Sequence, residues 1–265
     1  MLKIVVAGAD GRMGREVVKA VLNESDLTLV GAVDTRNHGK DVGELAGVGQ
    51  CGVKLAGNIG RVLEETGADV VVDFTTPDSV RDNLNIVLKH KVHLVVGTTG
   101  ISEENVAQID GRAMEAGVGV VIAPNFAIGA ILMMKFAAEA AKYMPHVEII
   151  EFHHDQKLDA PSGTAIKTAE LINSTREEFR QGNPEEYEKI PGSRGGEFSG
   201  MRLHSVRLPG LVAHQEVIFG GLGQTLTIRH DSINRESFMP GVILAVKKVV
   251  NSKGVTYGLE KLLTE

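Results

Sequence analysis

A run at residues 151–164 combines the side-chain types that proton transfer beside a bound anion requires. It reads EFHHDQKLDAPSGT and contains His153, His154 and Lys157, followed by the turn Gly163-Thr164. Histidine titrates near neutral pH and lysine keeps its positive charge, so the two types together suit protonation of an anionic substrate. A strand-like stretch precedes the run and a helix-like stretch follows it. Backbone N–H groups at the start of a helix are free to hold an anion.

The spacing within this run limits what its side chains do. Adjacent residues on a strand point to opposite sides, so at most one of His153 and His154 faces a given reacting atom. Lys157 follows His153 by four residues and can lie beside it. A single histidine is most often structural and a lysine is usually a solvated charge, but their combination before a helix start favours a functional site. No metal site is expected, because His-Glu-x-x-His is absent from the sequence and adjacent histidines do not easily share one metal. Three histidines on later predicted strands are given no role: His204, His214 and His230.

A glycine-rich turn, GADGRMG at 8–14, follows the apolar N-terminal stretch. A helix-like stretch comes next, and then a second apolar stretch that ends at Asp34. This order is that of the first unit of a Rossmann-type fold, in which the glycines let a pyrophosphate approach the helix N-terminus. Asp34 would accept hydrogen bonds from ribose hydroxyls. An acid alone favours NAD, whereas a nearby arginine, Arg12 or Arg36, can hold the 2′-phosphate of NADP, so the choice stays open.

Three further apolar stretches alternate with helix-like stretches up to residue 122. Strands are expected at 68–74, 92–96 and 118–122, with helices at 80–90 and 102–116 between them. The strands end in the turns TTP at 75–77, GTTG at 97–100 and APNF at 123–126. Alternating strands and helices predict a parallel sheet with right-handed crossovers, and ligands bind such sheets at the carboxyl ends of the strands. These turns and the first glycine turn all fall on that edge, so we expect a dinucleotide there.

The pattern changes after residue 126. A helix is expected at 129–144, a strand at 147–152, a helix at 164–172, and strands at 203–208, 213–219 and 224–230. The last three alternate polar and apolar residues, which predicts antiparallel strands with one polar face, a plausible oligomer surface. A helix that begins at Pro240 and the segment 257–263 are expected to return to the first domain. We therefore predict an α/β protein with a Rossmann-type parallel-sheet domain at 1–125 and 239–265, and an α+β domain with a mostly antiparallel sheet at 126–238.

Length and composition exclude several classes of protein. The 265 residues are enough for two modest domains with their own cores. The net charge of −6 argues against a nucleic-acid partner, which normally requires a basic face. The single cysteine, Cys51, excludes an intrachain disulfide and fits the cytoplasm. Charged residues interrupt the most apolar long segment, 126–144, and the N-terminus lacks the apolar region of a signal peptide, so we expect a soluble, cytoplasmic protein without a membrane partner.

Four motifs form a pattern that is far more specific than the glycine turn alone. They are GADGRMG at 8–14, DFT at 73–75, GTTG at 97–100 and ExHHxxKxDAPSGTA at 151–165. Over essentially its whole length the chain resembles the dihydrodipicolinate reductase family, the 4-hydroxy-tetrahydrodipicolinate reductases of bacterial and plant lysine and diaminopimelate synthesis. The resemblance implies NAD(P)H-dependent reduction of 4-hydroxy-tetrahydrodipicolinate, a cyclic dicarboxylate, to tetrahydrodipicolinate with loss of water. It also implies a dinucleotide-binding domain completed by the C-terminal segment, a middle domain for substrate binding and oligomerisation, and a homotetramer.

The resemblance also implies a role for individual residues. His153 would be the proton donor and Lys157 its cationic catalytic partner, and the substrate would bind to His154, Gly163 and Thr164. The cofactor, NADPH or NADH, would contact Gly8, Ala9, Asp10, Gly11, Arg12, Met13, Gly14, Asp34, Arg36, Gly97, Thr98, Thr99, Ala123, Pro124, Asn125 and Phe126. The sequence departs from some relatives after Asp34, because Thr35 precedes Arg36 here. The preference between NADPH and NADH therefore stays open.

Two other functions remain as alternatives. One is a different NAD(P)-dependent reductase or dehydrogenase of similar build, such as an amino-acid dehydrogenase. The other is a dinucleotide-sensing regulator that kept the fold and lost the chemistry, against which the intact cluster of His153, His154 and Lys157 weighs. By analogy alone, closure of the two domains about hinges near residues 125 and 239 is a further hypothesis.

Overall fold

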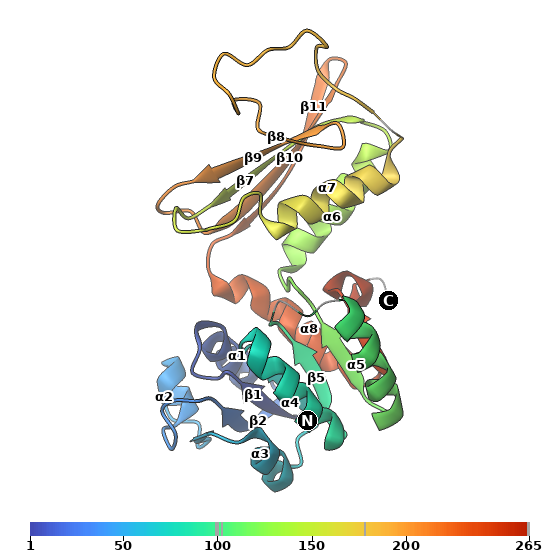
Figure 1. The fold of residues 1–265 in the computed structure, drawn as a ribbon. Coiled ribbons are helices and arrows are strands. Elements are labelled where there is room, and N and C mark those ends of the chain that lie inside the picture. The colour runs from blue at the N-terminus through green and yellow to red at the C-terminus, as the bar shows by residue number, and fades with distance from the viewer. Residues whose placement is uncertain (99–100, 102, 178, 264–265) are drawn as a thin grey trace. The chain divides into compact units, whose positions relative to one another are not determined.

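The computed structural model describes residues 1–98, 101, 103–177 and 179–263, with only the backbone of 103 and 104 (Figure 1). The chain folds into two compact units. The first unit consists of Met1–Ala127 and Arg235–Glu265, and the second of Ile128–Asn234. Thr99, one of the residues predicted to contact the cofactor, lies outside the described residues.

A sheet of seven strands forms the centre of the first unit. They are β1 (Leu2–Ala7), β2 (Leu27–Val33), β3 (Leu55–Ala56), β4 (Val70–Asp73), β5 (His93–Val96), β6 (Gly119–Ile122) and β12 (Gly254–Tyr257). Their order is β12-β6-β5-β4-β1-β2-β3, and every described pairing is parallel. The chain winds from β1 through β2 to β3, then crosses to β4 on the other side of β1. Ligands bind open sheets at such a reversal, beyond the carboxyl ends of the strands. The predicted Rossmann-type parallel sheet is confirmed.

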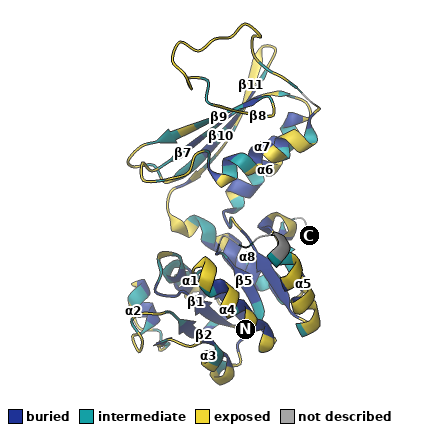
Figure 2. Ribbon diagram, in the orientation of Figure 1, coloured by how far each residue is buried: buried dark blue, intermediate teal, exposed yellow. Residues whose placement is uncertain are grey.

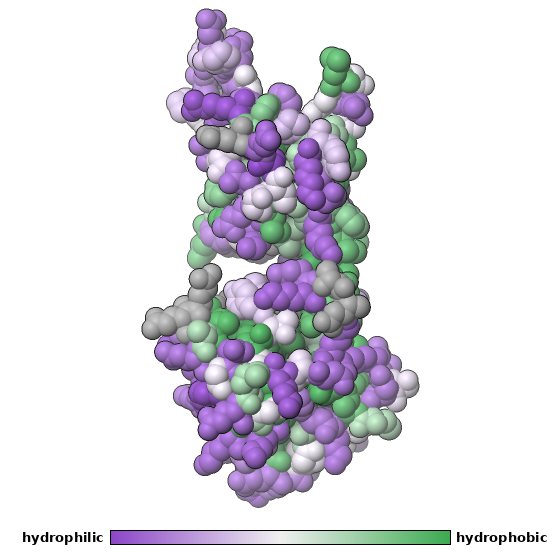
Figure 3. All heavy atoms as spheres, turned by 90° about the vertical axis from the view of Figure 1, so that its right-hand side faces the viewer, coloured by the Kyte–Doolittle hydropathy of each residue, from purple (hydrophilic) through white to green (hydrophobic). Residues whose placement is uncertain are grey.

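Helices cover the sheet of the first unit, because its strands are apolar on both faces. The α-helices are α1 (Arg12–Asn23), α2 (Val42–Ala46), α3 (Ile59–Thr66), α4 (Pro77–Lys89), α5 (Glu103–Ala116) and α8 (Met239–Val249), with 3-10 turns η1 (Arg235–Phe238) and η2 (Leu259–Leu262). α3, α4 and α5 pack on Val5, Val71 and Leu94 of the sheet. α1 and α8 contact one another and strands on the sheet. Figure 2 shows the strands of this unit mostly in the colour of buried residues, and Figure 3 shows hydrophilic side chains over much of the visible surface of this unit.

β12 was not among the predicted strands. It pairs with β6 and so makes the C-terminal segment an edge of the first sheet. Its sequence, GVTY, is only four residues long and is not an apolar run, so periodicity alone could not identify it. The C-terminal segment was expected to return to the first domain. β12 and α8 (Met239–Val249) both belong to the first unit.

The second unit is a five-stranded mixed sheet with helices on one face (Figure 1). Its elements are α6 (Ile128–Ala141), β7 (His146–His153), α7 (Gly163–Thr175), β8 (Gly196–Phe198), β9 (Met201–Arg207), β10 (Ala213–Gly221) and β11 (Gln224–Ser232). The sheet order is β11-β10-β7-β9-β8. Residues of β7 alternate between buried and partly exposed, because one face of the strand meets the helices and the other does not.

The prediction of an antiparallel strand near 203–208 is confirmed for the pairing of β9 with β8 and wrong for its pairing with β7. β9 pairs with β7 in parallel, from Glu148↔Arg202 to His153↔Arg207, whereas the other described pairings of this sheet are antiparallel. The connection between β7 and β9 contains α7, a long loop and β8, and parallel pairing requires a crossover of such length. The sheet as a whole is still mostly antiparallel, as predicted.

No helix among the described residues is long and apolar enough to cross a membrane. No group of three or more His, Cys, Asp or Glu side chains in the described part of the chain could hold a metal ion.

Candidate active site

His153 lies at the end of β7, beside a buried carboxylate. Its Nδ1 atom is 2.5 Å from Oε2 of Glu151, which is only 1% exposed. Residues two apart on a strand point to the same face, so the strand itself places these two side chains together. Nδ1 is therefore occupied, and Nε2 is the ring nitrogen left for a ligand.

Arg207 holds the other side of Glu151. Its Nη1 donates to Oε2 at 2.8 Å and its Nη2 donates to Oε1 at 2.7 Å, a bidentate pair between β9 and β7. The backbone N–H of Ser162 donates to Oε1 at 3.2 Å. Burial by itself raises the pKa of Glu151, but the hydrogen bonds from His153 and Arg207 outweigh it and lower the pKa to about 2. Glu151 is consequently an anion at neutral pH.

Lys157 belongs to the turn after β7. Its Nζ lies 2.6 Å from Oδ1 of Asp159, and this hydrogen bond lowers the pKa of Asp159. The backbone carbonyl of Asp159 accepts a hydrogen bond of 2.9 Å from Nη2 of Arg207. The turn that carries Lys157 and the strand that carries His153 are thus joined through the guanidinium of Arg207.

The start of α7 contains the turn that the sequence predicts to bind an anion. The Ser162 side chain caps the helix and accepts from the N–H of Ala165 at 3.2 Å. Gly163 and Thr164 are the first two helical residues, whose N–H groups have no partner within the helix. A Cβ built on Gly163 meets nothing within 4 Å, so a ligand has space to approach. His154, the third predicted substrate residue, follows the end of β7 and has an exposed side chain.

In the first unit, the glycines of the turn after β1 are required by close packing. Gly8 has a φ of +76°, and a Cβ on it would lie 2.5 Å from the Phe74 carbonyl oxygen. A Cβ on Gly14 would lie 2.0 Å from the carbonyl oxygen of Gly8. The close approach brings the start of α1 against the end of β1. The N-cap residue is Gly11, and no described side chain caps this helix, so its first N–H groups face an open edge that suits a pyrophosphate.

Asp34 is fixed at the same edge by backbone donors. Its Oδ2 accepts from the N–H of Asp10 at 3.0 Å, and its Oδ1 accepts from the N–H of Thr35 at 2.7 Å. The carboxylate of Asp10 is itself buried and binds Arg15 at 2.7 Å and Asn37 at 2.8 Å. Burial raises the pKa of Asp10, but the bonds from Arg15 and Asn37 lower it overall. An acid held in this way suits a ribose diol.

The turns after β4, β5 and β6 meet along this edge as well. Asp73, at the end of β4, is fully buried and accepts from the Thr75 hydroxyl at 2.6 Å and from the Thr98 hydroxyl at 3.3 Å. A Cβ on Gly97 would lie 2.0 Å from the ring of Phe74. That ring packs against the Phe126 ring, with centroids 5.8 Å apart. The remaining predicted cofactor residues are placed as follows: Ala9, Ala123 and Phe126 buried, Met13 and Asn125 half-buried, and Arg12, Arg36 and Pro124 exposed.

Sequence reasoning assigned no role to four residues that the structure places in these two clusters: Glu151, Asp159, Arg207 and Asp73. A signal existed for Glu151, because it precedes His153 by two residues on a predicted strand. No signal pointed to Arg207, which is one of several charged residues on alternating strands and reaches β7 only through the parallel pairing of β9.

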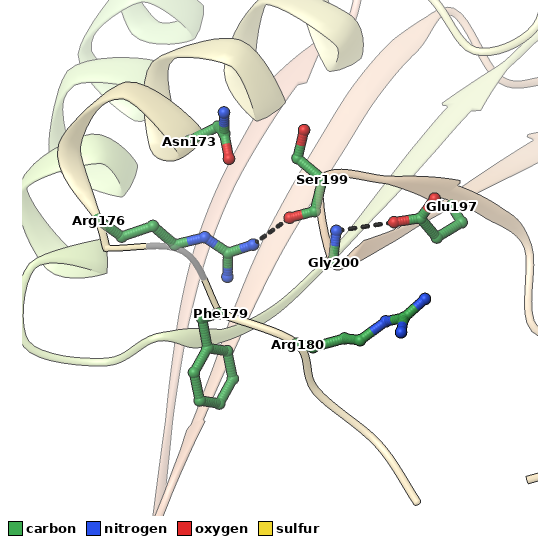
Figure 4. A pocket seen from close by; sticks show the side chains of 7 residues that line it. All are labelled: Asn173, Arg176, Phe179, Arg180, Glu197, Ser199 and Gly200. Atoms are coloured by element: carbon green, nitrogen blue, oxygen red, sulfur yellow. Dashed lines mark hydrogen bonds between the residues drawn. The ribbon is translucent and has the colours of Figure 1, made fainter. Parts of the chain in front are cut away.

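A pocket of about 700 Å³ lies elsewhere in the second unit, at the end of α7 (Figure 4). Its lining consists of Asn173, Arg176, Phe179, Arg180, Glu197, Ser199 and Gly200, none of which is a predicted site residue. The Arg176 guanidinium donates to the carbonyl oxygens of Pro145 at 2.6 Å and Ser199 at 2.7 Å. These bonds hold the end of α7 to the neighbouring turns, so the arginine has a structural use.

Comparison with known proteins identifies the family. Residues 2–126 match the family model described as "Dihydrodipicolinate reductase, N-terminus", and residues 129–263 match the model for its C-terminus. The chain belongs to the dihydrodipicolinate reductase family. A protein of Desulfitobacterium hafniense named 4-hydroxy-tetrahydrodipicolinate reductase is 56% identical over 263 residues, 99% of this chain and 98% of the relative. One of the same name from Halalkalibacterium halodurans is 54% identical, over 99% of this chain and 100% of the relative.

Solved structures agree with this assignment. The dipicolinate-bound dihydrodipicolinate reductase from Paenisporosarcina sp. TG-14 is 45% identical, with a TM-score of 0.88 over 98% of this chain and 99% of its own. An amine dehydrogenase from Mycobacterium smegmatis, at 15% identity and a TM-score of 0.67, shares the fold alone, over 98% of this chain and 95% of its own. The predicted family is therefore confirmed. So are the predictions of an oxidoreductase and of NADPH or NADH as its cofactor, since reductases of this family use NAD(P)H.

Proposed function

We propose that the protein reduces 4-hydroxy-tetrahydrodipicolinate to tetrahydrodipicolinate with loss of water, using NADPH or NADH, in cytoplasmic lysine and diaminopimelate synthesis. The observation that carries the proposal is the joined arrangement of His153, Lys157 and the open start of α7. The near-complete coverage by reductases of that name supports it further. A regulator without chemistry would have no need for a buried carboxylate behind an accessible imidazole.

The substrate is an anionic ring, and the second unit offers matching cations and donors. The relative from Paenisporosarcina binds dipicolinate, also a cyclic dicarboxylate. In this chain the Lys157 ammonium and the N–H groups of Gly163 and Thr164 would pair with the carboxylates, and exposed His154 would add a further donor. Charge-assisted hydrogen bonds of this kind are the strong ones, and a helix start adds its dipole.

His153 would donate the proton that completes the reduction. Loss of water and addition of one hydride and one proton convert the substrate into the product. The imidazole gives the proton from Nε2 while Nδ1 stays bound to Glu151, so the ring keeps its orientation. A well-placed general acid contributes roughly 10²–10⁴-fold to the rate.

The first unit would bind the cofactor, which supplies the hydride when it is bound. The turn at 8–14 and the start of α1 would hold the pyrophosphate, and Asp34 the ribose. Gly97, Thr98 and Thr99, with the turn at 123–126, would line the rest of the site. The turn fits such a group, because Gly8 and Gly14 let the start of α1 pack against the end of β1, where a Cβ on either would meet backbone atoms, and no described side chain caps that helix. Arg12 and Arg36 are exposed, which leaves both free for a 2′-phosphate.

The second unit would also carry the oligomer contacts, in a homotetramer. Its helices α6 and α7 occupy one face of the sheet, while the other face presents half-buried apolar side chains such as Ile150, Phe152 and Ile218. Such a face is stable when a second sheet covers it. In this proposal 1–125 and 239–265 bind the dinucleotide, and 126–238 bind the substrate and the neighbouring subunits.

An assay tests the proposed function directly. The substrate is generated enzymatically in place, NADPH or NADH is added, and the loss of reduced cofactor is followed by absorbance. We expect oxidation of the cofactor only when the substrate is present. Cofactor binding without any turnover would favour the regulator, and turnover with amino acids in place of this substrate would favour an amino-acid dehydrogenase.

A further inference from the structure

We infer that Glu151 and Arg207 are a positioning pair that keeps the proton of His153 on Nδ1, so that Nε2 alone exchanges a proton with the substrate. Through the same guanidinium, the pair also fixes the turn that carries Lys157. The inference deepens the proposed function and rests on the roles proposed there for His153 and Lys157.

The tautomer follows from the chemistry of the carboxylate. An ionised carboxylate accepts hydrogen bonds and donates none. Since Glu151 is ionised and its Oε2 lies 2.5 Å from Nδ1, that nitrogen must carry the hydrogen. A neutral His153 then has its lone pair on Nε2, and an imidazolium has its transferable proton there. The buried glutamate thus decides which ring nitrogen does chemistry.

The carboxylate is unable to turn away from the ring. Arg207 occupies both oxygens, and the N–H of Ser162 occupies Oε1 again. Arg207 is the residue paired with His153 across the parallel strands β7 and β9, so the guanidinium approaches from the neighbouring strand. A bidentate arginine fixes the plane of a carboxylate as well as its position.

A purely structural ion pair would not account for these contacts. A buried pair contributes little net stability compared with apolar residues of the same volume. Here each member has additional partners, and these partners lie in the proposed site. Glu151 binds the imidazole and the N–H that precedes Gly163, and Arg207 binds the carbonyl of Asp159, whose carboxylate binds Lys157. Three separate segments of the site are held by two side chains.

The test is the variant Glu151→Gln in the full-length enzyme. An amide supports either tautomer, so we expect kcat to fall roughly 10²-fold or more, by analogy with an Asp→Asn change behind a catalytic histidine. The KM for NADH should stay within about twofold, since the cofactor motifs lie in the other unit. The alkaline limb of the kcat profile should move to lower pH, because the anion that favours the imidazolium is gone. With Glu151 neutral, the charged side chains left in this network are Arg207, Lys157 and Asp159.

Glu148→Gln is a matched control. Glu148 lies on the same strand but the opposite face, where it binds Arg194 at 2.6 Å and His204 at 2.8 Å. Like Glu151, it binds one arginine and one histidine, but it lies outside the proposed site. We expect Glu148→Gln to keep the pH profile of the wild type, whatever it does to stability. A similar change of profile in both variants would overturn the inference.

Nitrogen-15 spectra of the histidine rings add a readout that needs no activity. In the wild type at alkaline pH, His153 should show a protonated Nδ1 and an unprotonated Nε2, and assignment comes from the loss of its signals in His153→Ala. The opposite tautomer in the wild type overturns the inference even if Glu151→Gln does not fold. If wild-type enzyme fails to reduce the substrate, the proposed function fails instead. Normal wild-type turnover, loss in His153→Ala and an unchanged Glu151→Gln refute the positioning pair alone.

Discussion

Glu151 should make the free energy of unfolding depend on pH between about 4.5 and 2, and the substitution Glu151→Gln should remove that dependence. Its pKa is lowered from 4.5 to about 2 in the folded state. A difference of about 2.5 pKa units corresponds to about 3 kcal/mol, at 1.36 kcal/mol per unit. Because the folded pKa is the lower one, this stabilisation is complete above pH 4.5 and is lost as the pH falls towards 2. Below both values, the protonated acid resembles the neutral amide of glutamine.

The variant Glu151→Gln is therefore expected to be less stable than the wild type at pH 7, by about 3 kcal/mol, since Arg207 loses its buried counter-charge. The difference should narrow as the pH falls from 4.5 to 2, and the two proteins should then converge. The assay is urea unfolding at a series of pH values, followed by far-ultraviolet circular dichroism because the chain contains no tryptophan.

Glu170→Gln serves as the control for this experiment. Glu170 lies on α7 with a half-exposed side chain, 3.4 Å from Lys167, and exposed pairs contribute about 0–1 kcal/mol. Its stability should follow that of the wild type at every pH. If Glu151→Gln lost stability in parallel with the wild type between pH 4.5 and 2, Glu151 would not be an ion in the folded protein, and the account of the site would be refuted.

Three further predictions concern turnover and the cofactor. His153→Ala should lower kcat roughly 10²–10⁴-fold with little change in the Kd for NADH, and wild-type-like turnover would remove His153 from the mechanism. Gly14→Ala places a Cβ 2.0 Å from the Gly8 carbonyl oxygen, so the affinity for NADH, measured by fluorescence, should fall at least about tenfold. A Cβ on Gly111 meets no atom within 4 Å, so the control variant Gly111→Ala should bind NADH normally. Asp34→Asn should weaken the binding of NADH more than that of NADPH, because the proposed role of the acid is to accept from the ribose, and its charge would repel a 2′-phosphate. Equal weakening of both cofactors in titrations would contradict that role.

The sequence predicted the first unit well because its signals are local. The apolar runs predicted as strands at 92–96 and 118–122 each begin one residue before β5 and β6 and end with them. The helix predicted at 80–90 corresponds to α4, which begins three residues earlier, at Pro77. β3 and β12 were missed, being two and four residues long and held mainly by their neighbours in the sheet. Strand direction was harder to predict, because the alternation of polar and apolar residues in β9 shows which residues share a face but not which strand β9 pairs with.

The candidate site likewise contains residues that the sequence predicted and residues that only the structure revealed. His153, Lys157 and Gly163 lie close along the chain, so their types and spacing were enough to predict a site. Arg207 follows His153 by more than fifty residues, and its part in the network depends on a register that no sequence pattern states. Asp34 was predicted from its spacing to the glycine turn, but the N–H of Asp10 that fixes it emerged only from the structure.

The parallel pairing of β7 with β9 has a consequence for folding. The strand β7 and the helix α7 can form from neighbouring residues, whereas Arg207 reaches Glu151 only after a long connection has closed. Contacts of such sequence separation form late, since the entropy of closing the loop must be lost before they stabilise anything. A chain released or cleaved before residue 207 would bury a carboxylate without its counter-ion. His153, the proposed proton donor, is therefore expected to acquire its final orientation among the last steps of folding, and activity would then report on completed assembly of the second unit.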